Sequence, residues 1–285
     1  MVTNKGHWPP LLKEEPLIKI RPSSLAVSLA LKETWARREL LYFLIWRDLK
    51  VRYRQTALGV AWVVLQPLLT ALVFTVFINR LAHVRSDGIP YPLFAYAGLL
   101  TWTFFSNAIS TCSYSLISNS YIITKVYFPR LIILLAIIGV RLVDLLVAAS
   151  VLVLLLLCYG ISVSWSLLVL PALVGELALL TLGIGLWFSV LTVRYRDVGT
   201  IMPVLIQLWM FASPIIYPAS LVPERWRSLY ALNPIVGIIE GMRAALFGLP
   251  FDWRSIIISL IVTLLSLAYF VSTFCRAEEN LIESL

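Results

Sequence analysis

Charged residues are scarce in this chain, and the classes of protein that depend on them are thereby excluded. Asp, Glu, Lys and Arg make up 13% of the 285 residues, and hydrophobic residues make up 60%. Soluble domains carry about 25% charged and about 45–50% apolar residues. The composition therefore predicts an integral membrane protein with several spans, and it excludes an ordinary soluble domain.

Residues that usually carry chemistry are also few. The chain has two histidines and three cysteines (Cys112, Cys158 and Cys275), and no CxxC spacing. A disulfide framework and a metal site are therefore not indicated. HExxH, GxxxxGK[ST] and an ordered Ser–His arrangement are all missing from the sequence. We expect no catalytic residues, no cofactor in this chain and no nucleotide hydrolysis by it.

Long apolar runs are what the sequence has in place of these motifs. They predict an all-α membrane protein with six transmembrane helices, because about twenty apolar residues cross a bilayer. The predicted spans are 57–78, 91–112, 131–158, 166–192, 200–217 and 256–275. Residues 1–31, which contain Pro9, Pro10, Pro16 and Pro22, predict an N-terminal tail, and residues 277–285 a C-terminal one.

The net charge of +8 does not indicate nucleic acid, because Lys and Arg gather at the ends of the apolar runs. Cytoplasmic loops hold an excess of these residues. With both termini in the cytoplasm, most of the 23 Lys and Arg fall on that side. The other side then holds Arg80, Arg85, Arg225, Arg227, Arg243 and Arg254. The count predicts a multi-pass protein with both termini in the cytoplasm.

The stretch from Trp46 to Pro67 passes from a dense cationic patch into the first span. Just before it, residues 32–55 predict an amphipathic helix in the membrane surface followed by a basic loop, with a soluble helix packed on a partner as the alternative. The patch attracts anionic groups at the inner leaflet. We expect it to meet an anionic lipid substrate, and the alternative is that it only fixes the orientation of the chain in the membrane. Its candidate residues are Arg38, Arg47, Lys50, Arg52 and Arg54.

Charges within the predicted spans are costly and are therefore candidates for function. Arg141 and Asp144 are three residues apart and predict a mutually neutralising pair, with a transport role as the alternative. Glu176 is expected either to pair with Arg141 or to be protonated. Glu240 and Arg243 repeat the three-residue spacing and predict a local clamp.

Residues 218–253 are too long for a hairpin loop and are interrupted by proline and glycine. Two apolar pieces, 226–232 and 235–247, predict a re-entrant pair near an exit, where Asn233 also lies; an interfacial hairpin is the alternative. Aromatic residues deep in the spans either pack and face lipid or offer flat surfaces to sugar rings. The channel candidates are Trp62, Phe74, Trp102, Phe105, Trp187, Trp209 and Phe211.

Several motifs together resemble the permease subunits of ABC-2 type exporters of lipid-linked polysaccharide, such as O-antigen, capsule and teichoic acid. They are RDLKVRYRQTALGVAWVVLQP at 47–67, YFPR at 127–130, VRYRDV at 193–198 followed by Pro203, SPIIYP at 213–218, and LNPI at 232–235 followed by Arg243. The resemblance implies a homodimer that works with two copies of a separate ABC ATPase, which binds ATP and Mg²⁺. It implies a glycan on a polyprenyl pyrophosphate as the substrate, with the pyrophosphate bound by the basic patch, and a location in the bacterial inner membrane.

The resemblance also implies a coupling helix at about 115–130, where the ATPase would contact the permease. Its candidate residues are Tyr121, Lys125, Tyr127, Phe128 and Arg130. An ABC-2 permease for drugs or small lipids is the first rival function. A membrane-embedded glycosyl- or phospho-transferase is the second, and it lacks the acidic constellation that such chemistry needs: Asp48 and Asp197 each lie beside basic residues.

Overall fold

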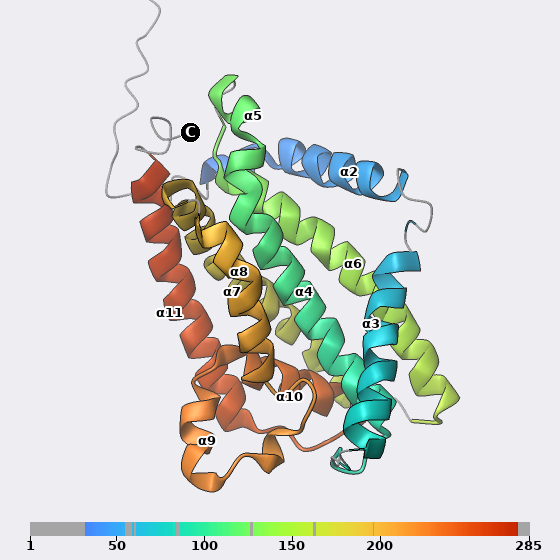
Figure 1. Ribbon diagram of the computed structural model, residues 1–285. Helices are drawn as coiled ribbons and strands as arrows, with labels where there is room; N and C mark the ends of the chain where they lie inside the picture. The colour runs from blue at the N-terminus through green and yellow to red at the C-terminus, as the bar shows by residue number, and fades with distance from the viewer. Residues whose placement is uncertain are drawn as a thin grey trace, which may run out of the picture.

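The computed structural model describes residues 32–54, 59, 61–81, 83, 86–125, 128–161, 164–195 and 197–278. The prediction for the tail at 1–31, most of the C-terminal tail, and Tyr127 lie outside these residues. Within them every regular element is helical, as the sequence predicted (Figure 1). The elements are α2 (Arg38–Arg54), α3 (Ala61–Phe74), η1 (Thr75–Leu81), α4 (Tyr91–Ser118), α5 (Ser120–Lys125), α6 (Leu131–Cys158), η2 (Trp165–Val169), α7 (Leu170–Arg194), α8 (Asp197–Phe211), η3 (Ala219–Leu221), α9 (Glu224–Ala231), α10 (Pro234–Phe247) and α11 (Trp253–Glu278).

Four helical stretches are long and apolar enough to cross a membrane: Ala61–Arg80, Leu131–Cys158, Trp165–Arg194 and Trp253–Ala277. The remaining two predicted spans are helices as well, but they differ from the four. The helix α8 has only 15 residues. The helix α4 has 28 residues but falls short in hydropathy, because its second half is rich in Ser, Thr, Asn and Tyr.

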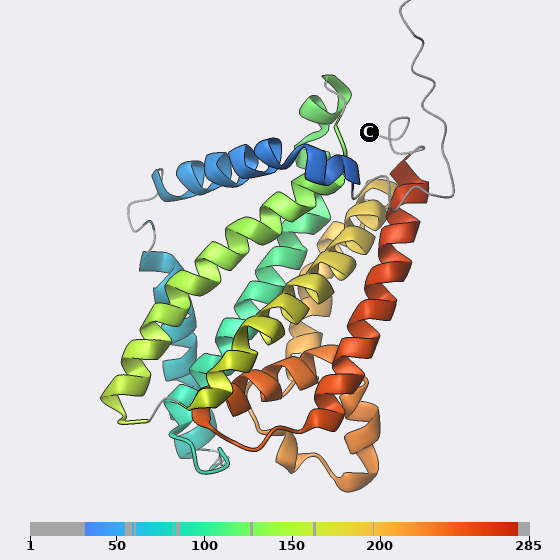
Figure 2. The same cartoon turned by 180° about the vertical axis from the view of Figure 1, so that it is seen from behind.

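The helix α4 forms the centre of the bundle. It packs against α3, α6, α7, α8 and α10, and most of its side chains are buried. In Figures 1 and 2, α3 and α6 lie on one side of it, and α7 and α11 lie on the other. Because its neighbours shield it, α4 carries polar side chains through the bundle that a lipid-facing helix would not tolerate.

The helix α2 lies across one end of the bundle and packs on α6 (Figure 1). Leu44 is buried, and Ile45 sits on Gly139 of α6, where a Cβ would lie 2.6 Å from the Ile45 Cδ1 atom. The apolar side chains of residues 32–54 are therefore divided between a packed face and an exposed one. Trp35 and Tyr42 face outward, with 73% and 71% of their surface exposed.

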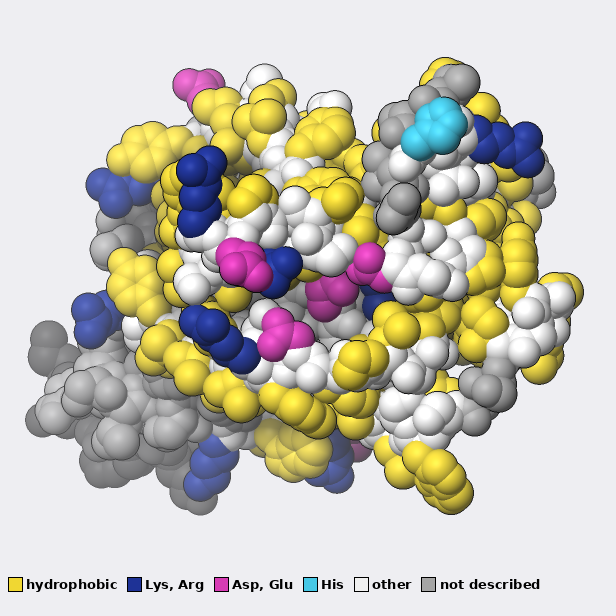
Figure 3. Space-filling view, turned by 90° about the horizontal axis from the view of Figure 1, so that it is seen from below, with side chains coloured by type: hydrophobic (Ala, Val, Ile, Leu, Met, Phe, Trp, Pro, Cys, Tyr) yellow, Lys and Arg dark blue, Asp and Glu magenta, His cyan; other side chains and the backbone are white. Residues whose placement is uncertain are grey.

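The opposite end of the bundle holds α9 and α10, which match the two apolar pieces predicted between 226 and 247. The helix α10 packs among α4, α7 and α11, whereas α9 lies outermost (Figure 2). Acidic and basic side chains gather near the middle of this end, within a largely apolar surface (Figure 3). Gly248 ends α10 in the left-handed region, with φ of 67°, which glycine adopts at little cost.

Several predicted boundaries differ from the structure, and two of the differences are instructive. The fifth predicted span extends to residue 217, but α8 ends at Phe211, because Pro214 disfavours helical geometry in the residue before it. The predicted coupling helix at 115–130 is not one helix. The helix α4 continues to Ser118, Asn119 caps it, and the short α5 follows.

Candidate functional site

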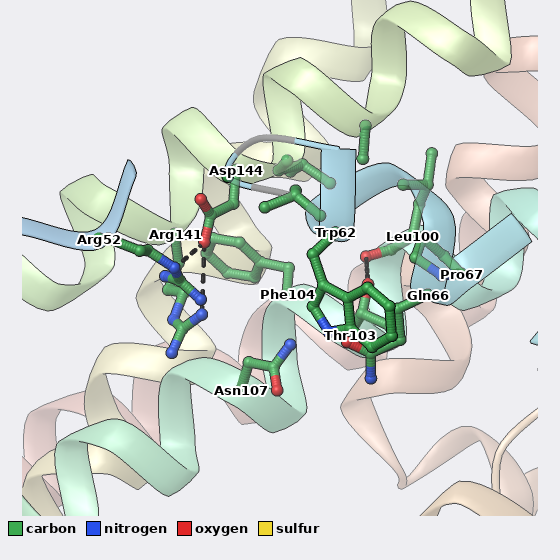
Figure 4. A pocket seen from close by; sticks show the side chains of 14 residues that line it. Arg52, Trp62, Gln66, Pro67, Leu100, Thr103, Phe104, Asn107, Arg141 and Asp144 are labelled. Atoms are coloured by element: carbon green, nitrogen blue, oxygen red, sulfur yellow. Dashed lines mark hydrogen bonds and ion pairs between the residues drawn. The ribbon is translucent and has the colours of Figure 1, made fainter. Parts of the chain in front are cut away.

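A cavity of about 410 Å³ lies between α3, α4 and α6, beside the C-terminal end of α2. Its volume falls within the range of small-molecule sites. Charged side chains gather at one end, and Trp62 and Gln66 lie at the other, with Phe104 between them (Figure 4). The lining residues are Arg52, Gly59, Trp62, Val63, Gln66, Pro67, Leu100, Thr103, Phe104, Asn107, Arg141, Asp144, Leu145 and Ala148.

The charged end is organised around the carboxylate of Asp144. The Arg52 Nη1 atom donates to the Asp144 Oδ2 atom at 2.7 Å, and Arg141 Nη1 donates to the same oxygen at 3.3 Å. The Tyr53 hydroxyl donates to Oδ1 at 2.6 Å. The ion pair expected from the spacing of Arg141 and Asp144 is present, and it includes Arg52 from α2, which the spacing does not indicate. Two guanidinium groups thus share one carboxylate.

The phenol of Tyr53 is a permanent donor in this cluster. Burial, together with the hydrogen bond to Asp144, raises the pKa of Tyr53 to about 12. A neutral phenol therefore persists throughout the physiological pH range. On the other side of the cluster, Arg141 Nη2 donates to the hydroxyl of Thr111 on α4 at 2.6 Å. The cluster thereby joins α2, α4 and α6.

The remaining wall of the cavity is polar but uncharged. Gln66 on α3 and Asn107 on α4 bring side-chain amides to it, beside the half-exposed indole of Trp62. In the described part of the chain neither amide has a hydrogen-bond partner, so both groups are available to a ligand. An aromatic face beside amides suits a sugar ring, because the C–H groups of the sugar can pack on the indole and its hydroxyls can bind the amides.

Sequence reasoning missed Tyr53, Thr103, Asn107 and Thr111, although the last three carried a signal. They recur every four residues in a predicted span, and this spacing places side chains on one face of a helix. A polar stripe within a membrane helix indicates a surface that faces protein or water. Pro67 of α3 lies on the same wall, where Thr70 donates to the carbonyl of Gln66 at 2.9 Å.

Among the basic residues predicted to bind pyrophosphate, Arg52 alone lines this cavity. Arg47 forms an ion pair with its neighbour Asp48 at 2.8 Å. Arg38, Lys50 and Arg54 lie exposed along α2. The patch is thus divided into an outer group on the helix surface and one inward-facing arginine.

Comparison with known proteins now places this chain in a family. The sequence model described as "ABC-2 type transporter" matches residues 39–247. The chain belongs to the ABC-2 type transporter family. An O-antigen export system permease protein RfbA of Klebsiella pneumoniae is 30% identical over 249 residues, which cover 85% of this chain and 95% of that protein. RfbA of Myxococcus xanthus is 31% identical, with 76% and 83% covered. The polysialic acid transport protein KpsM of Escherichia coli is 24% identical, with 84% and 93% covered.

The predicted channel aromatics of this ABC-2 chain are not brought together on one surface. Trp62 lines the cavity, whereas Trp102 and Phe105 are buried in the bundle. Trp209 meets Phe105 edge to face with the ring centroids 5.1 Å apart. Trp187 stacks on Phe270 at 5.3 Å. Two further candidates lie apart from these contacts: Phe74, which is partly buried, and Phe211, which is exposed.

The other predicted residues occupy both ends of the bundle. Tyr121 and Lys125 are exposed on α5, while Phe128 and Arg130 are buried. Glu176 accepts a hydrogen bond from Ser259 of α11 at 2.5 Å. It therefore pairs across α7 and α11, and the alternative that it pairs with Arg141 is wrong.

The clamp predicted for Glu240 and Arg243 is present, with 2.9 Å between the Glu240 Oε1 and Arg243 Nη1 atoms. Arg243 also donates to the carbonyl oxygens of Pro214 and Ile215, at 2.5 and 2.9 Å. Asn233 accepts from the Trp209 indole at 3.0 Å and caps α10. This end of the chain is therefore tied together by buried polar side chains.

Proposed function

We propose that this chain is the membrane-spanning permease of an ATP-driven exporter that carries a lipid-linked polysaccharide, of O-antigen, capsule or teichoic-acid type, across the bacterial inner membrane. The observation that carries the proposal is the cavity between α3, α4 and α6. It combines cationic groups that suit a phosphate with an indole and amides that suit a sugar. The names of the O-antigen and polysialic acid relatives agree with this substrate class.

In the proposed topology the chain crosses the membrane six times, through α3 with η1, α4, α6, α7, α8 and α11. The central position of α4 supports a span despite its polar residues, because neighbouring helices satisfy and shield them. The excess of Lys and Arg around α2 supports a cytoplasmic location for that end and for both termini. The α9–α10 pair would then lie at the outer side, entering the membrane and returning.

The proposed assembly is a homodimer of permeases with two cytoplasmic ABC ATPases. A second copy requires an apolar surface, and α3 and α8 expose large apolar side chains, among them Leu69, Leu72 and Leu208. In Figure 1 the two helices lie on either side of α4. The exposed α5, which projects beyond the bundle at the α2 end, supports a contact with the ATPase.

The mechanism follows from the division of the basic patch. The exposed Arg38, Lys50 and Arg54, with Arg47, would attract the diphosphate at the inner leaflet, at about 1 kcal/mol for each cation near the surface. Arg52 would then receive it, since a guanidinium fork matches phosphate oxygens. The first sugar would lie along Trp62. ATP-driven movement at α5 would open a path toward α9 and α10, where the glycan leaves.

Export from cells that lack the native permease tests this proposal. We expect Arg52→Glu to insert normally and to lower glycan export at least tenfold, because it replaces an attractive contact with repulsion. Export at the wild-type rate would contradict the proposed site. The rival export of drugs or small lipids is tested by ATP hydrolysis in the reconstituted complex. We expect lipid-linked glycan to stimulate hydrolysis more strongly than small amphiphiles.

A further inference from the structure

The charged cluster at Asp144 lies between two cavities. The first is the cavity of about 410 Å³ described above. The second, of about 260 Å³, lies between α2, α4 and α6 and is lined by Asp48, Val51, Arg52, Thr111, Ile137, Val140 and Arg141. Arg52 and Arg141 line both. The two guanidinium groups therefore separate a space beneath α2 from a space within the helical bundle.

The carboxylate of Asp144 occupies the position that an anionic ligand would take between these arginines. It accepts from both guanidinium groups, at 2.7 and 3.3 Å, and from the Tyr53 hydroxyl at 2.6 Å. Arg52, Arg141 and Asp144 contribute two cations and one anion, so these three groups together carry a net positive charge. A phosphate offers more acceptor oxygens than a carboxylate and more negative charge, so it competes well with Asp144 for the two guanidinium groups.

The surroundings indicate what such an anion would be attached to. In Figure 4 the Arg52 and Arg141 side chains converge on Asp144 at one end of the cavity, and the indole of Trp62 and the amide of Gln66 lie at the other. Asn107 lies along the wall between them. An anion bound at the arginines would thus be followed, within the same cavity, by a surface for a sugar. A lone inorganic anion would leave that surface unused.

We propose that Arg52 and Arg141 form the binding site for the diphosphate of a sugar-bearing lipid headgroup, and that Asp144 is an internal anion that holds this site until the diphosphate displaces it. Displacement breaks the tie between α2 and α6 and joins the two cavities. Binding of the headgroup is thereby linked to release of α2. This inference rests on the proposed function, because it specifies how the same cavity takes its substrate.

Titration of the permease–ATPase complex in phosphatidylcholine nanodiscs, followed by native mass spectrometry, tests the inference. The probe is polyprenyl diphosphate. We expect Asp144→Asn to raise its affinity and Arg141→Gln to lower it, each by on the order of tenfold, the size typical of one charge-assisted hydrogen bond. Tyr53→Phe loosens Asp144 without a change of charge and should raise the affinity about two- to threefold. The Tyr53→Phe variant therefore still tests the inference if Asp144→Asn does not fold.

A matched control is available at the other end of the chain. Glu224 is also three residues from an arginine, with 3.8 Å between its Oε1 atom and Nη1 of Arg227. Glu224→Gln makes the same chemical change as Asp144→Asn but far from the cavity, and we expect it to leave the affinity unchanged. Equal affinity in Tyr53→Phe and the wild type, or full binding by Arg141→Gln, would overturn the inference.

Two further probes identify the source of the phosphate. Inorganic pyrophosphate should compete with polyprenyl diphosphate, which supports a site that binds the diphosphate itself. If phosphatidylglycerol binds as tightly and responds equally to Asp144→Asn and Tyr53→Phe, the site takes membrane phospholipid and the inference is overturned. If the wild type binds polyprenyl diphosphate and exports glycan, but the substitutions at Asp144, Tyr53 and Arg141 leave the affinity unchanged, this inference alone is refuted. Absence of wild-type binding and of export would refute the proposed function as well.

Discussion

The pairs Arg141–Asp144 in α6 and Glu240–Arg243 in α10 have the same spacing and the same kinds of group, and yet their surroundings are opposite. Arg243 is 1% exposed, donates to backbone carbonyls of the 214–215 segment, and lies over the Phe94 ring at 3.5 Å. Asp144 opens onto a cavity and is held by side chains from a different helix. A pair tied to fixed backbone is structural. A pair tied to side chains that can move is suited to binding.

Substitution of Arg243 should cause the largest loss of stability. It should also distinguish the structural pair in α10 from the binding pair in α6. Arg243→Met leaves Glu240 and the carbonyl groups of Pro214 and Ile215 without their donor, at a cost of about 3–5 kcal/mol. We expect loss of folded protein, seen as low yield and a lowered unfolding temperature in detergent. Arg141→Gln should instead give normal yield with weakened ligand binding. Equal yields for the two variants would remove the distinction drawn between the pairs.

A smaller disturbance of the same region comes from Gly98 on α4. A Cβ at this position would lie 2.6 Å from the Arg243 Nη2 atom and 3.1 Å from the carbonyl oxygen of Ile215. Gly98→Ala should therefore destabilise the protein by about 1–3 kcal/mol, as overpacking does. Gly175→Ala in α7 is the matched control, because nothing lies within 4 Å of its Cβ. Equal unfolding temperatures for the two variants would show that Arg243 is less tightly enclosed than the contacts indicate.

Substitutions at the cavity should weaken ligand binding without lowering the stability of the protein. Trp62 is 52% exposed, so Trp62→Ala should leave the unfolding temperature unchanged. The affinity for a sugar-bearing polyprenyl diphosphate should fall about three- to tenfold, the size expected for an aromatic contact. Trp62→Phe should restore most of it. An equal loss of affinity for polyprenyl diphosphate without a sugar would contradict the assignment of Trp62 to the sugar.

The smallest expected effect is the stability contributed by the hydrogen bond from Tyr53 to Asp144, and it is tested by its dependence on pH. The folded pKa of Tyr53 is raised to about 12 from the ordinary value of 10.0. Its hydrogen bond to Asp144 therefore contributes fully below pH 10 and is lost as the pH rises through 12. The stability difference between the wild type and Tyr53→Phe, about 1 kcal/mol, should be constant between pH 6 and 9. A difference that varies within this range, measured by urea unfolding in detergent, would show that another group controls the contact.

Much of the helical architecture could be predicted from the sequence, because apolar runs and helix-breaking residues are local signals. The third predicted span, 131–158, matches α6, and the two apolar pieces before the last span are helices. Local spacing also indicated that Arg141 and Asp144 would meet. The length of the coupling segment was less predictable, since Asn119 ends α4 at a point that no proline or glycine marks.

The site itself required the tertiary structure. Arg52 and Asp144 are 92 residues apart, and nothing in their local sequence indicates contact. They meet because Ile45 sits on Gly139 and thereby fixes where α2 crosses α6. The same crossing brings Tyr53 to the carboxylate. For the aromatic candidates, the tertiary structure separates residues that the sequence grouped. The sequence predicted one channel surface, but Trp102, Trp187 and Trp209 lie in separate packing contacts.

The most direct test of the proposed function is translocation by purified permease and ATPase in sealed vesicles. We expect ATP-dependent movement of a polyprenyl-diphosphate-linked glycan across the bilayer, and at least a tenfold lower rate with Arg52→Glu. Movement of the lipid-linked glycan by Arg52→Glu at the wild-type rate would contradict the proposed diphosphate site. Equal transport of small amphiphiles by the wild type would contradict the proposed function.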